Sequence, residues 1–144
     1  MRLKVTLDTN VLISGFLFGG ACEDILRLGS NRQIQVFTSK PIVDEFREKL
    51  ETKLRRKYHI NSTIIEYSIA VYLGFSDIVV VSSTPRKSYT VDKMDNLVID
   101  TALVSNSSYL ITGDRKHLLK AAVPSLNIIA PADFLELFRA LDPV

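Results

Sequence analysis

The sequence of 144 residues predicts an α/β fold in which helices cover both faces of a five-stranded parallel sheet. Short runs of aliphatic and β-branched residues alternate along the chain with stretches of helical periodicity. Most of the short runs are apolar at nearly every position, which is typical of parallel strands buried on both faces. The expected strands are residues 3–7, 34–38, 78–81, 109–112 and 126–129.

The first of these runs departs from the pattern of the others. Polar Lys4 and Thr6 alternate with its apolar residues, and such alternation is typical of a strand with one solvated face. The alternation therefore weakens the case for placing this strand at the centre of the sheet.

Helices between the strands are indicated by start signals and by apolar periodicity. Ser39 and Pro41 are typical of a helix start. The helix that they begin has one apolar stripe of residues three or four positions apart: Val43, Phe46, Leu50 and Leu54. Further helices are expected from about residue 11 and over residues 22–28, 63–73, 96–104 and 131–141. No repeat or linker interrupts this order, so we expect a single domain over residues 1–144.

The composition excludes several classes of protein. The single cysteine, Cys22, rules out an intramolecular disulfide framework and a cysteine-cluster metal site. His59 and His117 are far apart with no ligand spacing, so a histidine-based zinc site is not expected. Without a secretory signal or a run of ~20 apolar residues, the chain is expected to be cytoplasmic with no membrane partner. A net charge of +2 does not identify a polyanion binder, so nucleic-acid contacts must come from local clusters.

Four carboxylates fall where expected strands end or where the following helices begin. Asp8 ends the first strand, and Asp114 follows the fourth through a glycine. Glu45 and Asp95 lie near the starts of the helices after the second and third strands. Parallel α/β sheets place their sites at this carboxyl edge. Clustered carboxylates repel one another unless a cation neutralises them, and oxygen ligands without Cys or His favour Mg²⁺ or Mn²⁺.

Each acid also has a purely structural interpretation. Asp8 fits a cap of the next helix, and Glu45 fits a first-turn acid favoured by the helix dipole. Asp92 and Asp95 resemble an N-cap residue and its partner three positions later, and Asp114 fits a cap of residues 115–119. A cap position is also a site position, so these interpretations do not exclude a function.

Asp100 is unusual because its expected helix is apolar nearly all round. A buried lone carboxylate is costly unless it is paired or linked to a metal. The sequence leaves both possibilities open, with a Lys, an Arg or a backbone amide as the partner in the structural case.

Three motifs make the sequence similar to the PIN-domain family, and specifically to the small prokaryotic PIN proteins described as VapC-type toxin components. Residues 7–12 (LDTNVL) resemble the opening hydrophobic-Asp-Thr-Asn motif of the family. Residues 92–96 (DKMDN), with Ala102 seven positions after the second acid, resemble the DxxDN…A segment of one subgroup. Residues 109–114 (YLITGD) resemble the signature that ends in Thr-Gly-Asp.

The resemblance implies a PIN-like three-layer α/β/α fold and metal-dependent cleavage of RNA phosphodiester bonds. It implies four catalytic, metal-binding acids: Asp8, Glu45, Asp95 and Asp114. Asn10 and Thr112 would support them through hydrogen bonds. The Pro-Asp that the subgroup often carries between its two acids is here Lys93-Met94, which leaves the role of Asp92 open. Asp100 stands where relatives often carry Glu, and is expected to be an additional metal-binding or supporting residue.

The expected mechanism uses one or two Mg²⁺ ions. A water whose pKa the ion lowers attacks the phosphorus, and a carboxylate takes its proton. No His or Lys is expected among the acids. Phosphate contacts are expected from the run of Arg115, Lys116 and His117, which follows Asp114 and adjoins the site. They are also expected from the loop at residues 82–91, which holds Arg86, Lys87 and an aromatic Tyr89 suited to stacking on an unpaired base.

The expected partners are an RNA substrate, a second copy of the chain, and a cognate antitoxin whose basic segment would fill the acidic cleft. Four apolar positions fit either a dimer face or the core: Ile64, Ile65, Ile69 and Leu73. Either toxin activity or RNA processing fits the chemistry.

The alternative function is a catalytically silent PIN-like module that binds RNA or acts as a scaffold. The presence of all four acids argues against this alternative, and metal-dependent cleavage separates it from a nuclease. A haloacid-dehalogenase-type phosphatase would need Asp at the position of Asn10, and a Rossmann nucleotide binder would need a G-x-G-x-x-G motif that is absent.

Overall fold

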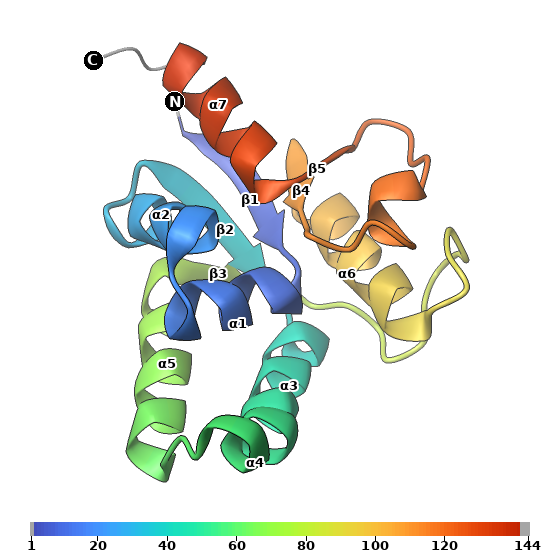
Figure 1. The fold of residues 1–144 in the computed structure, drawn as a ribbon. Coiled ribbons are helices and arrows are strands. Elements are labelled where there is room, and N and C mark those ends of the chain that lie inside the picture. Colours follow the sequence, from blue (N-terminus) through green and yellow to red (C-terminus); the bar gives the residue numbers. More distant parts are fainter. Residues whose placement is uncertain (1, 142–144) are drawn as a thin grey trace.

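A computed structural model describes residues 2–141 and has a five-stranded parallel sheet flanked by helices (Figure 1). The strand order is β3-β2-β1-β4-β5. The strands are β1 (Leu3–Leu7), β2 (Ile34–Thr38), β3 (Ser76–Ile78), β4 (Tyr109–Ile111) and β5 (Asn127–Ile129). The expected three-layer α/β/α architecture with a parallel sheet is therefore confirmed.

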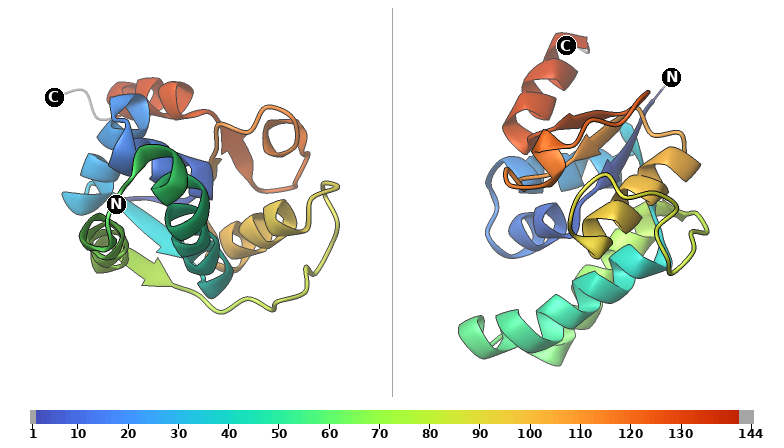
Figure 2. Two further views of the ribbon diagram at one scale, coloured as in Figure 1. Left: turned by 60° about the horizontal axis from the view of Figure 1, so that its bottom comes forward. Right: turned by 90° about the vertical axis from the view of Figure 1, so that its right-hand side faces the viewer.

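Helices cover both faces and one end of the sheet. They are α1 (Thr9–Leu17), α2 (Gly20–Ser30), α3 (Lys40–Lys49), α4 (Arg55–Tyr58), α5 (Ser62–Phe75), α6 (Lys93–Val104) and α7 (Pro131–Leu141). Helix α6 packs against β1, β2 and β4, whereas α2 packs against β2 together with α1, α5 and α7 (Figures 1 and 2). Helix α3 contacts α1, α5 and α6, so it lies across the end of the sheet where the site is expected (Figure 1).

The first strand lies at the centre of the sheet despite its polar residues. Thr6 is fully buried, and its hydroxyl forms a 2.9 Å hydrogen bond with the hydroxyl of Ser107, which satisfies the polar group inside the protein. The Lys4 ammonium lies 5.1 Å from the centre of the Phe37 ring. The alternation was therefore a wrong guide to position, since one polar residue is paired and the other packs along an aromatic ring.

The third strand lies earlier in the chain than expected. Helix α5 continues through Gly74 to Phe75, and β3 begins at the next residue, Ser76. This strand occupies an edge of the sheet. Its partner β2 ends at Thr38, whose carbonyl accepts one further bond from the Val79 N–H at 2.8 Å. Beyond that point no strand continues, and Val80 is 89% exposed. The prediction of a buried strand over residues 78–81 was wrong for this reason.

The apolar stripe of the 40–58 segment is present, but the helix is not uniform. Phe46 and Leu50 are fully buried, and a π-helical turn (Leu50–Leu54) joins α3 to α4. On α5 the four apolar positions divide between the two interpretations left open. Ile65 and Ile69 belong to the core, whereas Ile64 and Leu73 are exposed.

Candidate active site

Asp8 lies where β1 ends and α1 begins. Its backbone N–H donates to the carbonyl of Ile111, which holds it beside the end of β4 (3.0 Å). One carboxylate oxygen, Oδ1, accepts the Thr9 N–H at 2.8 Å, and the other, Oδ2, accepts the Thr112 hydroxyl at 2.8 Å. Asp8 thus caps α1, as one sequence interpretation had it, and is buried with both oxygens in fixed directions.

Thr112 and Asn10 connect the ends of β1 and β4. Thr112 is fully buried, and because its hydroxyl donates to Asp8, its oxygen accepts the N–H of Asp114 (3.0 Å). The side-chain oxygen of Asn10 accepts the N–H of Gly113 at 3.4 Å. These bonds hold the Gly113–Asp114 turn against the start of α1. Thr112, which bonds both Asp8 and the backbone of Asp114, fixes the position of one acid relative to the other.

Asp114 is held in its ionised form by the turn that follows it. Its Oδ1 accepts the N–H groups of Lys116 (3.0 Å) and His117 (3.2 Å). Partial burial acts to raise the pKa of Asp114, but these N–H groups and the nearby imidazole outweigh it and lower the pKa below its usual value.

Asp95 lies in the first turn of α6, opposite Asp114. Asp92 caps this helix by accepting the Asp95 N–H at 3.0 Å, which confirms the expected N-cap pair. Burial raises the pKa of Asp95 to about 7, and the negative charges of Asp92, Asp8 and Asp114 add to the increase. The carboxylates are thus close enough to disfavour one another's ionisation.

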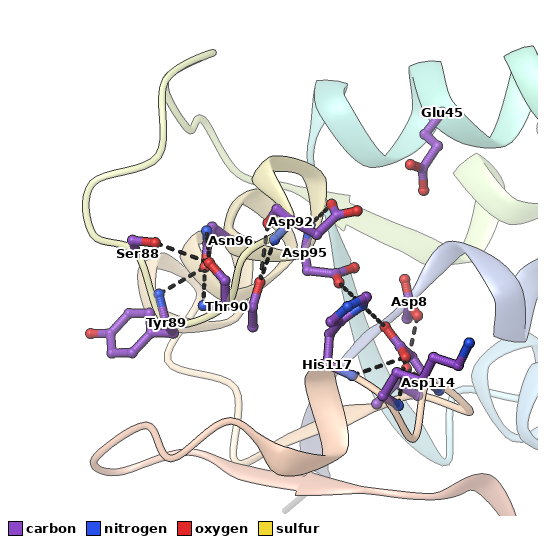
Figure 3. Close-up of polar contacts among 12 residues, drawn as sticks. Asp8, Glu45, Ser88, Tyr89, Thr90, Asp92, Asp95, Asn96, Asp114 and His117 are labelled. Carbon is purple, nitrogen blue, oxygen red and sulfur yellow. Dashed lines mark hydrogen bonds and ion pairs between the residues drawn. The ribbon is translucent and has the colours of Figure 1, made fainter.

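His117 lies among the acids, and the expectation that no histidine would do so was wrong. Its Nδ1 is 3.5 Å from Oδ2 of Asp95 and 3.6 Å from Oδ2 of Asp114 (Figure 3). One ligand atom from each of these three residues lies within 4.8 Å of the other two. The turn closed by the Asp114 carboxylate directs the imidazole back over the site. The available signal in the sequence was the Asp-x-x-His spacing directly after a strand, rather than the spacing between the two histidines.

Glu45 faces this group from α3, on the opposite side of Asp8 (Figure 3). It is mostly buried and lies outside the group formed by Asp95, Asp114 and His117. Lys49, one turn later, has its Nζ 3.6 Å from a Glu45 oxygen. Burial raises the pKa of Asp8 to about 6; the Thr112 and Thr9 hydrogen bonds oppose this rise, and the charge of Glu45 adds to it.

Asp100 lies about 140° around α6 from Asp95 and is not brought to the other acids. It is almost completely buried, and its Oδ2 accepts the N–H of Arg86 at 2.9 Å. Its Oδ1 has no hydrogen-bond partner among residues 2–141. Of the possibilities the sequence left open, the backbone amide is the partner found.

Asn96 holds the same loop, a role that the sequence did not suggest. Its Oδ1 accepts the N–H groups of Tyr89 (2.9 Å) and Thr90 (3.0 Å), and its Nδ2 donates to the carbonyl of Thr90 (3.0 Å; Figure 3). Asn96 and Asp100, one helical turn apart, therefore fix the backbone of residues 86–90 against α6.

Comparison with known proteins identifies the family of this chain. A family model described as a PIN domain matches residues 4–116, most of the chain. The chain belongs to the PIN-domain family. No curated protein matches the chain. The PIN domain shares its fold, at a TM-score of 0.63, with a chain in the crystal structure of VapBC2 from Rickettsia felis bound to a DNA fragment from their promoter. The two chains are 15% identical, over 89% of this chain and 98% of that one.

The residues of this PIN domain fit a divalent cation. Two carboxylate oxygens and one imidazole nitrogen form the compact group, and further acids lie close by. A cation would remove the repulsion that adds to the effect of burial on the pKa of Asp95. Separately, no helix within residues 2–141 combines the length and apolar character needed to cross a bilayer.

A basic cavity adjoins the group formed by Asp95, Asp114 and His117, here called the cation group. Its volume is about 210 Å³, and its lining includes Tyr89 and Thr90 from the loop together with Lys116, His117 and Lys120 from the segment after Asp114. The Lys87 ammonium lies 5.1 Å from the centre of the Tyr89 ring. Arg86, Lys87, Arg115 and Lys116 are all exposed. His117 is shared by the cavity and the cation group, so the two are neighbours.

Proposed function

We propose that this PIN domain, a single domain over residues 1–144, is a cytoplasmic metal-dependent endoribonuclease that hydrolyses RNA phosphodiester bonds. The proposed catalytic and metal-binding residues are Asp8, Glu45, Asp95 and Asp114. The observation that carries the proposal is the compact group of Asp95, Asp114 and His117, whose ligand atoms lie within 4.8 Å of one another. Burial raises the pKa of Asp95 to about 7, and the charges of Asp92, Asp8 and Asp114 add to the increase. A site built with uncompensated negative charge needs a cation to hold its acids ionised together.

A Mg²⁺ or Mn²⁺ ion, when bound, supplies charge neutralisation at the phosphate and a water of lowered pKa as nucleophile. The chain's own residues supply position. Asp114, kept ionised by two backbone N–H groups, and Asp95 are the proposed ligands. Thr9 and Thr112 orient the Asp8 carboxylate. Glu45 lies across the site, where the adjacent Lys49 balances its charge.

This function is tested by incubating the purified protein with labelled single-stranded RNA in Mg²⁺, Mn²⁺ or EDTA. We expect cleavage with either metal and none in EDTA. The Asp95→Asn protein is expected to keep its fold and lose cleavage, since it keeps the backbone N–H that Asp92 accepts. RNA binding without cleavage by the wild type would instead support the silent RNA-binding module.

We also propose that exposed basic residues beside the site bind RNA phosphates: Arg86, Lys87, Arg115 and Lys116. The support is the basic cavity between the loop and the segment after Asp114, where Tyr89 offers a ring for an unpaired base. The hydrogen bonds of Asn96 and Asp100 to the loop hold the backbone that carries Arg86 and Lys87 against α6.

The salt dependence of RNA binding tests these contacts. The slope of the logarithm of the binding constant against the logarithm of the salt concentration is negative. If Lys87 and Lys116 each neutralise one phosphate, the double variant Lys87→Ala/Lys116→Ala makes this slope shallower by about 1.4 for a single strand. Anisotropy titrations in EDTA, which prevents cleavage, measure the slope. Lys57→Ala on α4 is the matched control and should leave the slope unchanged; an equal change in both proteins would contradict the assignment.

The biological role that we propose is that of the toxin in a toxin–antitoxin pair, with a cognate antitoxin and a second copy of the chain as partners. Support for the role comes from the fold shared with a chain of the VapBC2 structure. Support for a dimer comes from apolar side chains exposed on and near α5: Phe18, Tyr58, Ile64, Tyr67 and Leu73.

A further inference from the structure

We propose that His117 is a nitrogen ligand of the divalent cation, so that the site prefers Mn²⁺ to Mg²⁺. This inference rests on the proposed metal site and goes beyond the four acids. It concerns which ion the site selects, and it is tested without RNA.

The positions of the three donor atoms carry the inference. Nδ1 of His117 is 3.5 Å from Oδ2 of Asp95 and 3.6 Å from Oδ2 of Asp114. Adjacent ligands of one octahedral ion, each at about 2.1 Å from it, lie about 3 Å apart. The imidazole nitrogen therefore needs to approach each carboxylate oxygen by only about half an ångström to share an ion with it.

The backbone fixes the imidazole in this place while leaving its nitrogen uncommitted. The His117 N–H donates to Asp114 Oδ1 at 3.2 Å, so the ligand pair is built into one turn of chain. Separations of 3.5 and 3.6 Å are too long for good hydrogen bonds from Nδ1 to either acid. The ring lies close to both carboxylates because of the turn, and its nitrogen is available to a cation.

The choice of ion follows from the chemistry of the donors. Mg²⁺ prefers oxygen ligands and gives up its waters reluctantly. Mn²⁺ shares the carboxylate ligands of Mg²⁺, but as a transition-metal ion it accepts an imidazole nitrogen more readily than Mg²⁺ does. A site of acids alone would bind Mg²⁺ and Mn²⁺ through the same oxygens. A nitrogen donor adds to Mn²⁺ affinity and contributes little for Mg²⁺, so the histidine acts as a selectivity element.

Mn²⁺ binding to the full chain, without RNA, tests this directly. Electron paramagnetic resonance titration gives the affinity, and electron spin echo modulation detects a coupled ¹⁴N nucleus. We expect imidazole ¹⁴N modulation in the wild type and its loss in His117→Gln. The variant should bind Mn²⁺ at least roughly tenfold more weakly, with Mg²⁺ affinity, measured by competition, changed much less.

Two further variants separate ligation from a structural effect. His59→Gln, which removes the exposed histidine after α4, should keep both the ¹⁴N signal and the Mn²⁺ affinity. His117→Asp replaces the imidazole nitrogen by an anionic oxygen donor. This variant should bind Mg²⁺ and Mn²⁺ with similar affinities.

The outcomes distinguish this inference from the proposed function. A Mn²⁺-loaded wild type without ¹⁴N modulation, or modulation that persists in His117→Gln, overturns the role of His117 and leaves the ribonuclease proposal standing. Failure of the wild type to bind either ion overturns the metal site itself, and with it both proposals.

Discussion

Asp8→Asn is expected to abolish metal-dependent RNA cleavage while making the metal-free protein more stable at pH 8. The carboxylate is buried, lies within reach of the charges of Glu45 and Asp95, and is held by two hydrogen bonds. Asparagine keeps the oxygen that accepts the Thr9 N–H and therefore keeps the helix cap. Because it removes the anionic charge proposed to bind the ion, we expect cleavage to fall by at least about a hundredfold.

The gain in stability follows from the pKa of Asp8, which burial raises from 3.8 to about 6. The folded protein then binds this proton more tightly than the unfolded chain, so the Asp8 contribution to the free energy of unfolding decreases as pH rises from about 4 to about 6. Above that range the ionised carboxylate costs up to about 3 kcal/mol. Asparagine avoids this cost, but its amide nitrogen cannot accept the Thr112 hydroxyl as Oδ2 does, which costs about 1 kcal/mol. We therefore expect a net gain of up to about 2 kcal/mol at pH 8 and a loss of about 1 kcal/mol near pH 4.

Urea unfolding in EDTA at the two pH values, with RNA cleavage in Mn²⁺, measures both effects. Asp133→Asn, at an exposed acid in the first turn of α7, is the matched control. It should leave cleavage unchanged and, because it removes a charge favoured by the helix dipole, should lower stability at pH 8 by less than about 1 kcal/mol. A well-folded Asp8→Asn protein that cleaves at the wild-type rate would remove Asp8 from the site. A variant that is less stable than the wild type at pH 8 would contradict the account of its burial.

Asn96→Ala is expected to release residues 89 and 90 of the loop from α6, while Asp100 still holds Arg86. The substitution removes three hydrogen bonds and leaves the N–H groups of Tyr89 and Thr90 without their acceptor. The expected cost is about 1–3 kcal/mol. If this cost is confined to the loop, the amides of Tyr89 and Thr90 exchange with solvent roughly 10- to 100-fold faster, while the core amides exchange at unchanged rates.

Hydrogen exchange, followed by NMR or mass spectrometry, measures this release. Asn61→Ala is the matched control, because Asn61 also bonds a backbone N–H, that of Ile64 at 2.9 Å, but at the start of α5. It should lower global stability by about 1 kcal/mol and leave the loop protected. Equal protection of the loop in wild type and Asn96→Ala would show that other contacts hold it.

The approach of Asp8 and Asp114 at one edge of the sheet could be predicted because the signals are local. Asp8 and Asp114 directly follow apolar runs, and parallel pairing then brings the ends of β1 and β4 together. The place of β3 could not be predicted in the same way, because it depends on where its partner β2 ends. An apolar run cannot be a buried strand where no neighbour remains to pair with it.

The residues that were missed depend on contacts with backbone rather than on residue pattern. His117 was expected beside the site as a phosphate contact, but its place among the acids depends on the turn in which Asp114 accepts the N–H groups of Lys116 and His117. Asn96 was visible as part of the DxxDN motif, but its partners lie in a loop whose path no periodicity describes. In both cases the residue type was known from sequence, and the missing information was the conformation of irregular chain.

The hydrogen bonds from Asn96 and Asp100 fix the backbone of the loop without fixing which side chains the loop carries. Asn96 and Asp100 grip only main-chain atoms of residues 86, 89 and 90, which every residue type offers except that proline lacks the N–H. Side chains on this loop are therefore free to change without loosening its anchor or disturbing the sheet. During evolution, substitutions in this loop can therefore change the surface beside the acids while the acids themselves stay in place.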